Sequence, residues 1–126
     1  MTIEEIKEEC ERMQNYLEIT TTDDTNELVG RLTDINVYLA RSGFLLAEAK
    51  LMQDKATQAV FSHYTEALVK MPSNTAKQFI SSATADINYV VNWLDRLNRA
   101  CVHQGDNIRT QISFAKEELK LTKSGY

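Results

Sequence analysis

One proline and four glycines are the strongest helix breakers in this chain of 126 residues. An all-β fold needs a turn signal about every 8–12 residues, and the sequence does not supply enough turn-forming residues for that. The single corner is Pro72-Ser73-Asn74, where the residue before proline is pushed out of helical geometry and Ser73 or Asn74 can cap a new helix. The sequence therefore predicts an all-α protein built from a few long helices.

The first helix is predicted from about Thr2 to about Ile19. Thr2 and Glu5 form a capping-box pattern, in which each side chain satisfies a free backbone N–H group at the start of a helix. One apolar stripe follows at three- and four-residue steps, at Ile3, Ile6, Cys10, Met13 and Leu17. This helix is strongly acidic.

Two long helices are predicted after it, over about residues 24–70 and 74–121, within one all-helical domain that spans residues 1–126. Asp24 and Glu27 repeat the capping pattern at the start of the second helix. In both long helices the apolar residues alternate at four- and three-residue steps, which is the heptad spacing of coiled coils.

A short corner between two long helices predicts a long antiparallel hairpin that resembles a coiled coil. Folding back at Pro72 pairs Ser42 with Gln104 and Gln53 with Asn92, and such polar layers would fix the alignment of the helices. The hairpin cannot bury its wide apolar faces by itself. The first helix can bury only part of them, because it covers less than half of the length of the hairpin. We therefore expect a homo-oligomer.

Charge is distributed unevenly along the chain. Residues 1–30 contain nine acidic and two basic side chains, whereas residues 31–126 contain nine acidic and twelve basic ones. The net positive charge of residues 31–126 favours binding of a polyanion. An acidic first helix with a solvated outer face would produce the same asymmetry.

Catalytic and metal-binding patterns are sparse. The sequence has no glycine-rich phosphate loop, no pair of histidines at metal-ligand spacing and no serine nucleophile elbow, so we expect no catalytic residues, no metal and no cofactor. His63 and His103 are predicted to lie far apart. Arg96 and His103 are similar to the Arg-x4–6-His motif of HEPN ribonucleases, in which the arginine binds the scissile phosphate and the histidine transfers protons. A ribonuclease of this class, using Arg96 and His103, ranks third among the expected functions, after the two described below.

The expected compartment is the cytoplasm. No secretory leader and no apolar run long enough to span a membrane is recognisable. The two cysteines, Cys10 and Cys101, are too few for a disulfide framework and are expected to be reduced thiols.

Basic and aromatic residues alternate along the two long helices. Proteins that bind single strands combine a positive track for phosphates with aromatic faces on which bases stack. The alternative is that the charges are solvated while the aromatic side chains fill the core. The residues in question are Arg31, Arg41, Lys50, Lys55, Lys70, Lys77, Arg96, Arg99, Arg109, Lys116 and Lys120, with Tyr38, Phe44, Phe61, Tyr64, Tyr89, Trp93 and Phe114.

Three segments follow one another along the second long helix: Asn36-Val37-Tyr38-Leu39-Ala40-Arg41, the Ala/Lys/Glu-rich stretch 47–56, and His63-Tyr64. In this order they resemble the small helical recombination mediators of T-even-type phages. The return segments from Tyr89 to Asp95 and from Arg109 to Ile112 lie where that family has its second long helix. The similarity covers about residues 28–119.

The resemblance implies a non-enzymatic, ring-forming phage or prophage protein in the bacterial cytoplasm. Such a protein binds single-stranded DNA and helps to load a recombinase. On matched positions the implied DNA contacts are Arg41, Lys50 and Lys55. A second alternative is a structural coiled-coil adaptor that binds another protein and has no affinity for DNA.

Overall fold

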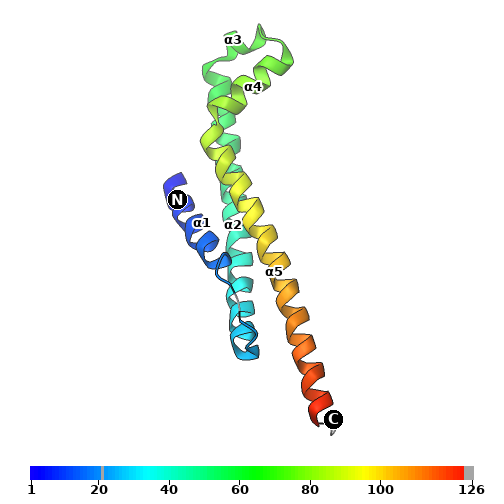
Figure 1. Ribbon diagram of the computed structural model, residues 1–126. Coiled ribbons are helices and arrows are strands. Elements are labelled where there is room, and N and C mark those ends of the chain that lie inside the picture. Colours follow the sequence, from blue (N-terminus) through cyan, green and yellow to red (C-terminus); the bar gives the residue numbers. More distant parts are fainter. Residues whose placement is uncertain (21, 124–126) are drawn as a thin grey trace.

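The computed structural model describes residues 1–20 and 22–123, and it confirms that the protein is all-helical, with no β-strand in the described part. The helices are α1 (Ile3–Leu17), α2 (Thr25–His63), α3 (Thr65–Val69), α4 (Ser73–Ala83) and α5 (Ala85–Lys123). In Figure 1, α2 and α5 run side by side in opposite directions, α1 packs along them, and α3 and α4 form the far end. None of the described helices is both long and apolar enough to cross a bilayer.

Two of the three predicted helix caps are present, at Thr2 and Asp24, whereas α4 begins directly after Pro72 and neither Ser73 nor Asn74 caps it through its side chain. The Thr2 side chain accepts a hydrogen bond of 3.2 Å from the Glu5 N–H, and the Asp24 side chain accepts one of 3.2 Å from the Asn26 N–H. The first helix starts and ends within two residues of its predicted limits, which is the usual uncertainty at helix ends. Its buried residues are four of the five in the predicted stripe, namely Ile6, Cys10, Met13 and Leu17.

The long helices are shorter than the predicted ranges 24–70 and 74–121, because each is interrupted once. Tyr64 separates α2 from α3, and Thr84 separates α4 from α5. At both places a threonine hydroxyl donates to the carbonyl four residues earlier, from Thr65 to Phe61 at 2.6 Å and from Thr84 to Ile80 at 2.8 Å. Such bonds often bend helices, although the same bonds at Thr33 and Thr110 leave α2 and α5 unbroken. The chain therefore turns through a broad distal segment instead of one corner.

The alignment of α2 with α5 differs from the predicted pairing. Ser42 accepts a hydrogen bond of 3.0 Å from Asn98, not from Gln104, and Gln53 donates at 2.7 Å to Asn88, not to Asn92. Each partner lies one to two helical turns earlier in α5 than predicted. The broad distal segment explains the shift. Because the chain does not fold back sharply at Pro72, α5 begins at a different height along α2 than the prediction assumed.

The core is aliphatic and lies where α1, α2 and α5 meet. Ile6, Ile35, Leu45, Val90 and Leu94 are completely buried. Burial also raises the pKa of the Cys10 thiol to about 11, so this cysteine is protonated and part of the core. No aromatic side chain of the described residues belongs to the buried core. Tyr16, Tyr38 and Trp93 are half-buried and pack against the edge of the core, whereas Phe44, Phe61, Tyr64, Tyr89 and Phe114 are exposed, so the aromatic residues fill the core only at its margin.

Candidate nucleic-acid interface

The structure does not gather the three residues implied as DNA contacts into one site. Arg41, Lys50 and Lys55 all lie on α2, but Arg41 forms an ion pair with Glu9 of α1. Its Nε and Nη2 groups each donate a hydrogen bond of 2.8 Å to that carboxylate. Lys50 and Lys55 are exposed, and neither forms an ion pair with any residue in 1–20 or 22–123.

The contact between Glu9 and Arg41 makes stability depend on pH. The hydrogen bonds from Arg41 lower the pKa of Glu9 below its ordinary value of 4.5. The folded state therefore binds this proton more weakly than the unfolded chain does. The stabilisation is complete above the unfolded pKa and is lost as the pH falls through the folded pKa.

We expect Glu9→Gln to flatten the fall in unfolding free energy between about pH 5 and pH 3. Urea denaturation at a series of pH values measures this dependence of the unfolding free energy on pH. Glu8→Gln is the matched control, since Glu8 is an exposed α1 carboxylate without an ion pair in the part of the chain that the structure describes. Equal pH dependence in both variants would contradict the prediction.

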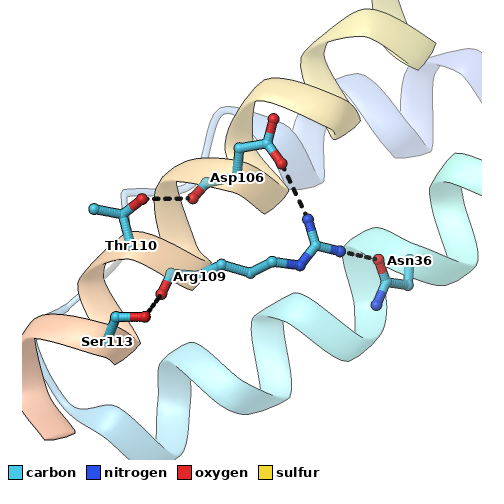
Figure 2. A network of polar contacts seen from close by, with 5 residues as sticks. All are labelled: Asn36, Asp106, Arg109, Thr110 and Ser113. Carbon is cyan, nitrogen blue, oxygen red and sulfur yellow. Dashed lines mark hydrogen bonds and ion pairs between the residues drawn. The ribbon is translucent and has the colours of Figure 1, made fainter.

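Most other arginines also have partners within the protein. Arg99 pairs with Asp95 at 3.1 Å. Figure 2 shows Arg109 between the two long helices, where it donates to Asp106 of α5 at 3.1 Å and to Asn36 of α2 at 3.5 Å. Arg99 therefore pairs within α5 and Arg109 links α5 to α2, and both charges are partly compensated.

The distal segment, residues 55–84, carries basic charge that is not compensated in this way. It contains Lys55, Lys70 and Lys77 but only one acidic residue, Glu66. All three lysines are exposed, and none forms an ion pair with a described residue. The acidic α1 packs lower on the α2–α5 pair (Figure 1), so positive charge is concentrated at one end of the molecule.

Aromatic rings lie among these lysines. The Tyr64 ring packs edge-on against Phe79, with 5.1 Å between ring centroids, and against His63 at 4.6 Å. Tyr64 is 42% exposed and Val69 is 70% exposed. The break at Tyr64 therefore brings α2 and α4 together at an open aromatic cluster, a surface on which bases could stack.

A surface groove with two aromatic residues lies between α1 and α5. This groove has a volume of about 970 Å³ and contains Tyr89 and Trp93, whose ring centroids are 5.7 Å apart. The charged residues that line it are Glu18, Asp95, Arg96 and Arg99, so its charges balance. A polyanion gains most of its affinity from uncompensated positive charge, and the distal segment is therefore the better candidate.

The two residues of the HEPN-like motif lie on α5. Arg96 and His103 are both exposed, and Arg96 lines the α1–α5 groove whereas His103 does not. Within residues 1–20 and 22–123, no three His, Cys, Asp or Glu side chains form a group that could hold a metal ion.

Sequence reasoning noted Lys70 and Lys77 beside the corner but missed the contact between Tyr64 and Phe79. These two residues are far apart in sequence, and their contact depends on the helix break at Tyr64. A signal in the sequence is the single acidic residue, Glu66, in the thirty residues from Lys55 to Thr84.

Comparisons of this chain with protein family models, with curated proteins and with solved structures find no match.

Proposed function

We propose that the protein is a non-enzymatic, homo-oligomeric helical-hairpin protein that binds single-stranded DNA through the distal segment. The observation that carries the proposal is the open aromatic contact between Tyr64 and Phe79, in the segment that also carries the exposed Lys70 and Lys77. Lysine ammonium groups attract phosphates, and exposed rings stack with bases without regard to sequence. The role suggested by the resemblance to phage recombination mediators is to help load a recombinase on that DNA.

Self-association strengthens such an interface. A segment with only three lysines contacts few phosphates, and contacts from several subunits on one strand add together. Oligomerisation therefore raises the affinity for DNA beyond that of one subunit. Lys50, on α2 below the distal segment, extends the basic surface towards the middle of the molecule.

A fluorescence anisotropy titration with a labelled oligothymidine tests the proposal. We expect Lys70→Glu/Lys77→Glu to weaken binding about tenfold, and affinity of the unaltered protein to fall steeply as salt is raised. Lys116→Glu/Lys123→Glu is the matched control, because it makes the same change in net charge near the other end of α5. Absence of binding at low salt, or equal loss in both double variants, would reject the distal interface.

A coiled-coil adaptor that binds another protein is the second candidate. It is favoured by the large apolar side chains on the outer face of α2, among them Val37 at 62% and Phe44 at 51% exposure. The adaptor predicts oligomers whose formation does not depend on DNA and no salt-dependent affinity for an oligonucleotide.

A further inference from the structure

The outer face of α2 carries an apolar stripe that no part of the described chain covers. Its residues follow the three- and four-residue steps of a heptad, and all five are exposed: Val37, Ala40, Phe44, Ala47 and Leu51. The buried residues Ile35, Ser42 and Ala49 lie on the opposite side of the same helix. We call these five residues the outer seam.

A row of charges with alternating sign runs along one edge of the outer seam. Asp34, Arg41, Glu48 and Lys55 recur every seven residues, so they share one face of α2. In heptad terms they occupy the position that flanks the seam, where charges decide which helices pair and in which direction.

We propose that the outer seam binds the outer seam of a second copy of this chain, with the two α2 helices antiparallel about a two-fold axis near Phe44 and Ala47. This arrangement sets Asp34 opposite Lys55 of the second copy and Arg41 opposite Glu48 of the second copy. By symmetry each pair occurs twice. All four contacts along this edge are then between opposite charges.

The same charges disfavour the neighbouring alignments. Sliding one helix by a heptad sets Arg41 against Arg41 and Asp34 against Glu48 of the second copy. A parallel, in-register pair sets Lys50 of one helix near Lys55 of the other. Like charges at these positions are destabilising, so the sequence of charges selects one antiparallel register.

Side-chain sizes agree with this register. It places Phe44 in the same layer as Ala47 of the second copy, and Leu51 in the same layer as Ala40, so that these two large side chains face small ones. Val37, at the edge of the seam, shares its layer with Asp54 of the second copy. Further out, Phe61 faces Gly30 of the second copy. Phe61 is 51% exposed, and a Cβ atom added at Gly30 would have no neighbour within 4 Å, so there is space for the ring.

The surroundings of Asp34, Arg41, Glu48 and Lys55 leave room for the ion pairs between the two copies. Arg41 uses Nε and Nη2 on Glu9 and leaves Nη1 for a second carboxylate, while its guanidinium lies 5.3 Å from the Phe44 ring centroid. Asp34 accepts one hydrogen bond of 2.8 Å, from the Tyr16 hydroxyl. Glu48 and Lys55 form no ion pair within the described residues, so both are available to a second copy.

The inference rests on the self-association in the proposed function and names its surface, and it assigns Lys55 to a contact between copies. Light scattering coupled to size-exclusion chromatography, without DNA, tests it. We expect Phe44→Glu to raise the dissociation constant of the dimer by more than about tenfold. Val69→Glu is the control, since Val69 is an even more exposed apolar residue, on α3.

Charge reversal tests the register. Asp34→Lys and Lys55→Glu should each weaken the dimer about tenfold, and the double variant Asp34→Lys/Lys55→Glu should restore it, because the pair is then reversed instead of lost. Circular dichroism checks that each variant keeps its helices. Failure of the double variant to recover would overturn the register.

A distance measurement tests the direction. A spin label on Ala59→Cys, an exposed site on α2, should lie about 40 Å along the helix from its symmetry mate in the antiparallel dimer. Cys10 and Cys101 are buried and do not compete for the label. A short distance, as in a parallel pair, would overturn the proposal.

The outcomes separate the two proposals. Self-association that is unaffected by Phe44→Glu rejects the outer seam but leaves the oligomer in place. A monomer at all concentrations rejects both the seam and the oligomer. DNA binding by the distal segment is judged independently by the anisotropy titration.

Discussion

Leu94→Ala is expected to lower the free energy of unfolding by about 3–4 kcal/mol, the largest effect of any single substitution considered. Leu94 is completely buried on α5 and belongs to the core that α1, α2 and α5 share. The loss combines the transfer free energy of the removed methyl groups with the cost of the cavity they leave. Because three helices meet here, none can close the cavity without leaving its other contacts.

Urea denaturation followed by circular dichroism measures this effect at one fixed protein concentration, so that self-association contributes equally to all samples. Leu119→Ala is the matched control, since it is the same substitution at a leucine that is 55% exposed near the end of α5. We expect a change below about 0.5 kcal/mol there. Equal effects at the two sites would mean that the core does not lie at the junction of the three helices.

Arg31→Ala is expected to cost about 2 kcal/mol and to loosen α1 selectively. The Nη2 group of Arg31 donates to the carbonyl oxygens of Tyr16 and Leu17, each at 3.4 Å, and to Gln104 Oε1 at 2.9 Å. Its guanidinium also lies 4.8 Å from the Tyr16 ring centroid. One side chain thus caps the carboxyl end of α1 and ties it to both long helices, where a cation also suits the helix dipole.

Hydrogen exchange of the α1 amides, together with urea denaturation, measures the Arg31 effect. Arg31→Lys is the informative companion variant, because lysine keeps the charge but lacks the planar fork that reaches several acceptors. It should recover only part of the loss. Unchanged protection of α1 in Arg31→Ala would show that the helix is held by its apolar stripe alone.

The candidate site was only partly visible in the sequence. Lys50, Lys55, Lys70 and Lys77 are exposed on the structure, and a solvated lysine is the ordinary expectation for any sequence. Arg41 is different, because its partner Glu9 is 32 residues away and no local pattern links the two. Whether a surface charge is available to a ligand depends on such distant partners.

The outer seam was hidden for a related reason. The heptad seam of α2 predicts Ile35, Ser42 and Ala49 on the face towards the neighbouring helix, which is confirmed, but α2 contains more apolar positions than one neighbour can cover, and the seam does not identify a second, outer stripe. The packing of α1 and α5 buries Ile35, Ser42 and Ala49 and leaves Phe44 and Leu51 on the outside. Only the positions of the neighbouring helices distinguish the two stripes.

The sequence by itself determined the helical class, the caps at Thr2 and Asp24, and the buried stripe of α1, because these depend on contacts between residues three or four positions apart. Tertiary structure decided the breaks at Tyr64 and Thr84, the pairing of Ser42 with Asn98 and the exposure of the aromatic rings. Those features depend on which packing of distant segments has the lowest free energy. A threonine or a tyrosine is locally compatible with each of the alternative packings, so its neighbours in sequence do not decide between them.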